Sequence, residues 1–189
     1  MNIRKHVLLL SLFLFFLLSS SLSAQKRLYV EGGASFLWPA DKNYQNAYGK
    51  STLLPEFNIG VRLFSRFCLF AGYSSLSDTG KIPDLDIDAK SKQKFYTCGA
   101  GFWIPVASKL SIRADGGIAY INYSEELLDI KINSNKMGYY LEGSLQVSIS
   151  KSFYLGGKAG YIFGKDKYED VDFKLGGPKA AVFIGLALL

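Results

Sequence analysis

Histidine is almost missing from the sequence, and its one example, His6, lies within the first ten of 189 residues. That region predicts a secretory signal peptide, so we expect the mature chain to contain no histidine at all. Without this side chain a Ser-His or Cys-His nucleophile pair and histidine metal ligands are excluded. We therefore predict a protein that is not an enzyme and that holds neither a metal nor a cofactor.

Long apolar runs are equally scarce. The one clear run, Val7 to Leu18, follows Arg4 and Lys5 and leads into small residues up to Ala24. This order predicts a signal peptide over residues 1–24 and a mature domain over 25–189. An uncleaved membrane anchor is the alternative, but the run is short for a spanning helix, which needs about 18 apolar residues. No later segment approaches that length, so we expect no transmembrane helix.

Cysteine is limited to Cys68 and Cys98. In an alternating pattern, Cys68 shares the inward positions of its segment, whereas Cys98 shares the outward positions of the next one. A disulfide requires Cβ atoms that approach each other. We therefore expect two free thiols.

Helical periodicity is also hard to find, and side chains instead alternate with the period of β-strands. Short connections at Ser65–Arg66, Ala107–Ser108 and Ser150–Lys151 alternate with longer polar ones, which is typical of an up-and-down barrel with turns at one end and loops at the other. We expect loops at Pro39–Ser51, Asp78–Ser91, Glu125–Asn135 and Asp166–Asp170. The eight expected strands are Arg27–Trp38, Thr52–Ser65, Phe67–Ser77, Lys92–Val106, Lys109–Ser124, Lys136–Ser150, Ser152–Lys165 and Val171–Leu189.

One face of these segments is apolar and the other is polar but rich in glycine and serine. Small residues suit a narrow lumen where opposite walls approach. We therefore place the apolar face outward, against lipid, in an all-β, eight-stranded, antiparallel transmembrane barrel. Aromatic side chains near both ends of the strands predict two interfacial girdles: Trp38, Tyr73, Tyr96, Tyr120, Tyr139 and Tyr161 toward the loops, with Phe67, Phe102 and Phe153 beside the turns. A soluble lipocalin-like barrel with its apolar face inward is the alternative.

The inward face carries seven charges: Glu31, Glu56, Arg62, Arg113, Asp115, Glu142 and Lys158. Buried charges must be paired or hydrated, so we interpret them as a polar plug; a gate for ions or small solutes is the alternative. We expect Arg113 to pair with Glu142, and Asp115 to pair with Lys158 or Arg62. We also expect the small lumen residue Gly117 to accept serine, and Pro178 to mark a bulge where the last strand changes parity.

These patterns resemble the small eight-stranded outer-membrane proteins of the OmpX and OmpA-transmembrane-domain type, over nearly all of Lys26–Leu189. The resemblance implies the outer membrane of a Gram-negative-type bacterium, a monomer, contact with outer-membrane lipids and insertion by the barrel-assembly machinery. It also implies a structural or surface-interaction role through four extracellular loops, with at most minor conductance. Such families usually end in an aromatic residue, whereas this chain ends in AVFIGLALL. A lipid-active barrel enzyme is a further alternative.

Other motifs are weaker. Asp84, Asp86 and Asp88 alternate as calcium ligands do, but Ala89 and Phe95 replace the glycine and glutamate of an EF-hand, which favours a solvated loop. The glycines from Gly156 onward lack phosphate-loop spacing. No nucleic-acid motif is present. Lysines of the expected loops are candidate contacts for lipopolysaccharide: Lys42, Lys50, Lys81, Lys90, Lys92 and Lys94.

Overall fold

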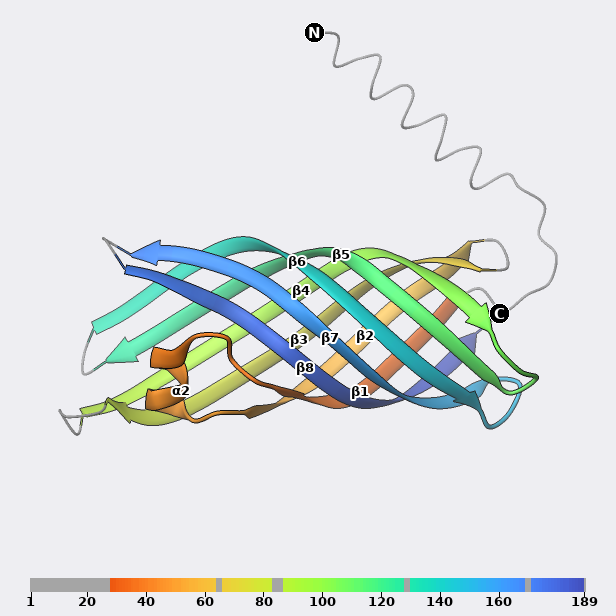
Figure 1. Cartoon of the computed structure of the whole chain (residues 1–189), viewed down its shortest axis with the longest axis horizontal. Coiled ribbons are helices and arrows are strands. Elements are labelled where there is room, and N and C mark those ends of the chain that lie inside the picture. The colour runs from red at the N-terminus through yellow and green to blue at the C-terminus, as the bar shows by residue number, and fades with distance from the viewer. Residues whose placement is uncertain (1–27, 64–65, 83–86, 128–129, 169–170, 189) are drawn as a thin grey trace, which may run out of the picture.

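The computed structural model describes residues 28–63, 66–82, 87–127, 130–168 and 171–188, and these form one closed antiparallel barrel (Figure 1). Its eight strands follow one another around the barrel in chain order, as the alternation predicts. The expected signal peptide lies outside the described residues. The strands are β1 (Leu28–Leu37), β2 (Thr52–Leu63), β3 (Phe67–Ile82), β4 (Ile87–Pro105), β5 (Leu110–Leu127), β6 (Ile130–Ser148), β7 (Phe153–Tyr168) and β8 (Val171–Leu188).

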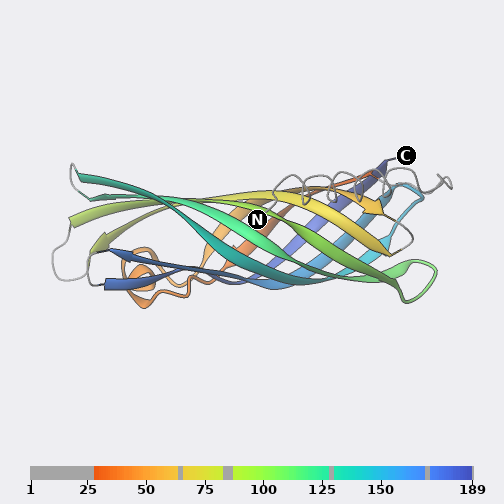
Figure 2. The ribbon, with the colours of Figure 1, turned by 90° about the horizontal axis from the view of Figure 1, so that it is seen from above.

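Closure is achieved by the first and last strands. Leu28 at the start of β1 lies opposite Leu188 at the end of β8, and the pairing continues to Leu37 opposite Lys179. The strands are long and strongly tilted, as the two perpendicular views show (Figures 1 and 2). A closed barrel has no free sheet edge, so its backbone hydrogen-bonding groups are satisfied without water.

The strands extend much further toward the loop end than the sequence predicted. Asp78 pairs with Ser91 and Glu125 pairs with Ile132, although all four positions were expected in loops. The loop predictions for Asp78–Ser91, Glu125–Asn135 and Asp166–Asp170 are therefore wrong for most of their length. Strands that rise above a membrane carry polar residues on their outer face, so polarity alone does not distinguish them from loops. Asp84 and Asp86 lie outside the described residues.

The remaining connection, between β1 and β2, contains the helix α2 (Lys42–Tyr48). Asp41 caps its first turn, because its Oδ1 atom accepts hydrogen bonds from the backbone N–H groups of Asn43 (2.9 Å) and Tyr44 (3.1 Å). The helix lies at the loop end of the barrel (Figure 1). In the described part of the chain no helix has the length and apolarity needed to cross a membrane.

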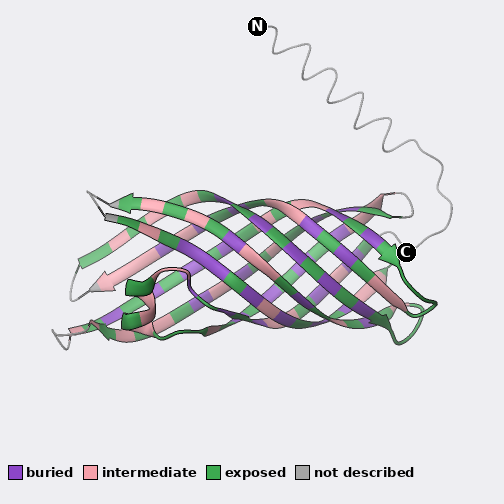
Figure 3. Ribbon diagram, viewed as in Figure 1, coloured by how far each residue is buried: buried purple, intermediate pink, exposed green. Residues whose placement is uncertain are grey.

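The outward and inward faces are those that the sequence predicted (Figure 3). Leu141, Val182 and Ile184 are each about three-fifths or more exposed, whereas Glu31, Arg113 and Lys158 are at most 5% exposed. The apolar side chains thus surround the barrel and the charged ones are enclosed. This arrangement is the reverse of the lipocalin-like alternative, in which the apolar face lines the interior.

The aromatic residues of the expected girdles lie on the outer surface. Tyr73, Tyr96 and Tyr120 are neighbours on three successive strands, with ring centroids 5.2 and 6.2 Å apart. Phe67 and Phe102, which pair between β3 and β4, are exposed near the turn end. Tyr and Trp favour the interface between lipid and water, so the rings border the exposed apolar band.

The expected bulge at Pro178 is absent from β8. Residue pairing with β7 continues without a shift from Phe163 opposite Gly176 to Tyr161 opposite Pro178. Gly176 and Gly177 adopt positive φ angles of 78° and 150°, and a Cβ on Gly177 would lie 2.0 Å from the Trp38 carbonyl oxygen. The two glycines therefore let the chain after β1 lie close alongside β8, where the N–H groups of Trp38 and Ala40 each donate at 2.9 Å to the carbonyl oxygens of Pro178 and Gly176.

Two smaller predictions have different outcomes. Cys68 is buried, Cys98 is exposed and both are free thiols, as expected. The expected tolerance of Gly117 to serine is wrong. A Cβ at Gly117 would lie 2.1 Å from the backbone oxygen of Cys98, so adjacent strands would have to move apart.

Candidate functional site

The polar section of the lumen contains a charge network on six of the eight strands. Of the seven charged residues that the sequence predicted to point inward, the structure buries Glu31, Glu56, Arg113, Asp115, Glu142 and Lys158. It adds Lys179, which is 7% exposed. The network divides into two clusters, each with a cation held between carboxylates.

Arg113 is the centre of the first cluster. Its two terminal nitrogens donate to Glu31 on β1, at 2.6 and 2.9 Å, and its Nε donates to Asp115 at 2.8 Å. The Tyr154 hydroxyl donates to Glu31 at 2.9 Å. The bidentate pair fixes both position and orientation of the guanidinium, and it connects β1 to β5 across the lumen.

Lys158 and Lys179 form the second cluster with Glu56 and Glu142. Lys158 donates to Glu56 and lies 3.4 Å from Glu142, while Lys179 lies 3.1 Å from Glu56 and 2.8 Å from Glu142. Each ammonium group therefore lies between two carboxylates. Asn58 also donates to Glu56, at 3.2 Å.

The expected ion-pair partners are wrong. Arg113 binds Glu31 and Asp115, and Lys158 binds Glu56 and Glu142. Alternation identifies the face on which a side chain lies, but not its height or the residue it meets across the lumen. Asp115 and Glu142 are direct neighbours on β5 and β6, and two carboxylates in this position need the cations around them.

Arg62, the seventh predicted residue, lies apart from both clusters. Its guanidinium stacks over the Trp103 ring, with 4.0 Å from Cζ to the ring centroid, and among the described residues it forms no ion pair with a carboxylate. A cavity of about 280 Å³ at the turn end is lined by both side chains together with Tyr29 and Tyr154. Arg62 thus belongs to the turn-end entrance of the lumen.

Between the charge network and the loop end the lumen is filled by apolar side chains, a layer that the sequence analysis missed. Along β5 the inward residues pass from Asp115 to Ile121 and then to Tyr123. The most deeply buried members are Leu37, Leu54, Phe95, Ile121 and Ile162, none more than 2% exposed. The sequence shows these residues alternating with outward ones. Because the residues on both faces are apolar here, the pattern does not reveal that one apolar set fills the lumen.

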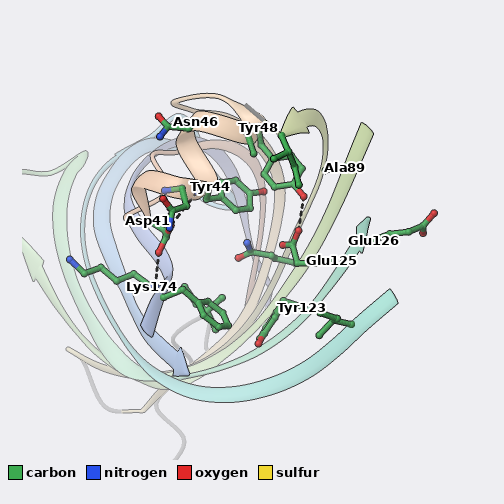
Figure 4. Close-up of a pocket in the computed structure, with 16 residues that line it drawn as sticks. Asp41, Tyr44, Asn46, Tyr48, Ala89, Tyr123, Glu125, Glu126 and Lys174 are labelled. Carbon is green, nitrogen blue, oxygen red and sulfur yellow. Dashed lines mark hydrogen bonds between the residues drawn. The ribbon is translucent and has the colours of Figure 1, made fainter. Parts of the chain in front are cut away.

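Beyond this layer, a cavity of about 640 Å³ opens at the loop end beneath α2 (Figure 4). Two tyrosines hold the helix over it. The Tyr44 hydroxyl donates to Asp78 on β3 at 2.8 Å, and the Tyr48 hydroxyl donates to Glu125 on β5 at 2.6 Å. Tyr123, Phe173 and Leu175 form much of the apolar wall; the remaining lining residues include Ile82, Ala89, Gln93 and Ile132.

Glu125 is the main carboxylate of this mouth cavity. One of its oxygens accepts from Tyr48 and the other accepts from the Ser91 hydroxyl at 2.6 Å. Burial raises the pKa of the Glu125 carboxyl above its usual range. Burial also raises the pKa of Tyr123 to about 12, so this phenol is a neutral part of the wall at physiological pH.

No protein-family model matches the sequence, and no curated protein is significantly similar to it. Solved structures, however, share its shape. OprG from Pseudomonas aeruginosa aligns with a TM-score of 0.68 at 11% identity, over 85% of this chain and 94% of its own. The chain has the fold of the small outer-membrane β-barrels. Neisserial surface protein A gives a TM-score of 0.65 at 12% identity, over 88% of this chain and all of its own.

A third barrel with this fold is Ail, the attachment invasion locus protein of Yersinia pestis, solved in complex with the heparin analogue sucrose octasulfate. It aligns with a TM-score of 0.58 at 12% identity, over 85% of this chain and 97% of its own. Identities this low establish the fold alone. Together with the exposed apolar band, the outer-membrane barrel fold accounts for why the charged face of this chain is enclosed and its apolar face is not.

Proposed function

We propose that the protein is an integral, non-enzymatic barrel of the outer membrane of a Gram-negative-type bacterium, with a surface-interaction role at its loop end. The observation that carries this proposal is a continuous apolar exterior around a lumen filled by paired charges. Lipid is the solvent that such an exterior requires. We further propose that residues 1–24 are a signal peptide and that the assembly machinery inserts residues 25–189 as a monomer.

The filled lumen supports at most minor conductance. A solute would have to displace the Arg113 cluster, the two-lysine cluster and the apolar layer that ends at Leu37 and Leu54. Small eight-stranded barrels are filled by their own side chains. The filled lumen therefore favours a role in keeping the barrel wall rigid over a role in conducting solutes.

Three measurements test this function: fractionation of cells that express the protein, and the gel mobility and conductance of the refolded protein. We expect the protein to sediment with outer membranes and to migrate differently on gels before and after boiling, because a closed barrel resists detergent unless heated. In planar bilayers we expect no stable conductance at the level of an open porin. A product that stays soluble without detergent, or one that forms long-lived porin-sized channels, would contradict the proposal.

A ladder of lysines supports lipopolysaccharide as one surface partner. Lys90, Lys92 and Lys94 all point outward from β4, directly above Tyr96 of the aromatic girdle. Their neighbours on β3 are the uncharged Thr79, Ser77 and Ser75. Glu126 lies 3.7 Å from Lys90 in a well-exposed pair, which water screens. Lipid phosphates at the height of the headgroups would meet this ladder.

Replacing the ladder should weaken binding of lipopolysaccharide. We expect the triple variant Lys90→Gln, Lys92→Gln, Lys94→Gln to lose affinity on the order of 100-fold at low salt, since each cation near an anionic surface contributes about 1 kcal/mol. Binding to lipopolysaccharide micelles by the refolded barrel is the measurement. The turn-end variant Lys109→Gln, Lys151→Gln is the control and should bind normally. An equal loss of lipopolysaccharide affinity in both variants would show that the ladder is not the binding site.

A further inference from the structure

The mouth cavity has the size and walls of a small-molecule site. Its volume of about 640 Å³ lies within the range of ligand pockets, roughly 300–1,000 Å³. Tyr123, Phe173 and Leu175 supply an apolar wall, and α2 covers one side. A ligand with an apolar ring or a short apolar chain would fill the mouth cavity.

An unpaired acceptor lies in the wall of the cavity. Gln93 is only 5% exposed, and its side-chain oxygen has no hydrogen-bond partner among the described residues. A buried polar atom without a partner costs free energy unless something satisfies it. Phe95, which is fully buried, follows Gln93 along the inward face of β4. Because Gln93 is part of the cavity lining, a donor bound in the cavity can supply the missing partner.

The charge of the cavity favours a cation over an anion. Glu125 projects into it with both oxygens accepting hydrogen bonds (Figure 4). Lys174 and Glu126 are also part of the lining, but Figure 4 shows both side chains directed away from the enclosed space. Asp41 is occupied as the cap of α2. The hydroxyl hydrogens of Tyr44, Tyr48 and Tyr123 are already donated, to Asp78, Glu125 and Asp166. The polar groups left to bind a ligand are therefore the acceptors of Gln93 and Glu125.

We propose that the mouth cavity binds a small apolar amine, with its body against Tyr123, Phe173 and Leu175 and its ammonium group donating to Gln93 and Glu125. The proposal goes beyond the surface-interaction function and involves none of the lysines of the ladder. An ammonium donor satisfies the Gln93 oxygen and places a positive charge next to the buried carboxylate. A carboxylate ligand of the same shape would face acceptors only.

Three probes with one body and different head groups test the chemistry. We expect 1-aminoadamantane to bind the full refolded barrel in lipid nanodiscs, measured by titration calorimetry. The neutral 1-adamantanol should bind at least tenfold more weakly, and 1-adamantanecarboxylate should bind weakest. Nanodiscs are required because detergent chains would compete for the cavity. Equal affinity for the amine and the carboxylate would overturn the proposal, as would no binding of the amine.

Variants test the residues. Gln93→Met keeps the length of the side chain and removes the acceptor, so we expect about a tenfold loss of amine affinity, the value of one buried hydrogen bond. Glu125→Gln removes the charge and should cost at least as much. Asp88→Asn, on the exposed outer face of β4, is the matched control and should bind as the parent does. Unchanged binding in both cavity variants would contradict the site, while heat-dependent gel mobility reports separately on the barrel itself.

Discussion

Arg113→Met should destabilise the barrel by about 3–5 kcal/mol, the largest loss that we expect from any single lumen substitution. Methionine fills much of the space but leaves Glu31 and Asp115 buried without their cation. Neither carboxylate is more than 5% exposed, so water does not readily replace the guanidinium. Urea unfolding of the refolded protein in lipid vesicles, followed by gel mobility, measures the effect.

A rescue variant separates charge from packing. Adding Glu31→Gln and Asp115→Asn to Arg113→Met removes the stranded charges, and we expect it to recover most of the lost stability, because neutral groups are far less costly to bury. Lys90→Met, in a pair with Glu126 whose two side chains are well exposed, is the control for removal of one ion pair and should cost under about 1 kcal/mol. If the rescue variant is no more stable than Arg113→Met, lost packing rather than unpaired charge explains the defect.

Ile59→Arg should destabilise the barrel by about 2–4 kcal/mol for a different reason, since it brings a cation into contact with lipid. Ile59 is exposed on the outer face of β2, near the middle of the outward apolar series from Leu53 to Leu63. The arginine has no carboxylate nearby on that face. The folded fraction after insertion into vesicles, read from gel mobility, should fall, and the urea midpoint should decrease.

The depth of the substitution provides the control. Leu53→Arg lies on the same strand and face but next to the loop end, where β2 begins at Thr52. There arginine reaches water and headgroups, so we expect a cost of about 0–1 kcal/mol. Equal losses at the two positions would contradict the placement of the lipid band, and no loss at either would favour a water-soluble barrel.

The fold was predictable because one signal, alternation with a period of two, repeats along the chain. It identified the strand count, the order, the three short turns and the face of most inward charges. Lys179 escaped it, because the Gly176–Gly177–Pro178 sequence suggested a change of parity, whereas the pairing of β8 with β7 continues through these residues without a shift. The strand extensions at the loop end were not predicted, because water rather than lipid surrounds their outer face and the residues there are as polar as those of loops.

The mouth cavity was not predictable from the sequence. Its walls come from β3, β4, β5, β6, β8 and α2, and they meet only because the barrel closes. Gln93 looks like an ordinary polar residue between Lys92 and Lys94. Its isolation becomes visible when Leu76 and Tyr123 are known to lie beside it on the neighbouring strands.

The closure between β1 and β8 has a consequence for the order of folding. Each of the other strand pairings joins successive strands, whereas this seam joins the two extremes of the barrel domain. Contacts between distant segments carry the largest loop-closure entropy and form late. The bonds from Glu31 to Arg113 and from Glu56 to Lys179 also join distant segments, 82 and 123 residues apart in sequence. We therefore expect the charge network to act after the folding transition state, as a brake on unfolding that leaves the rate of insertion nearly unchanged.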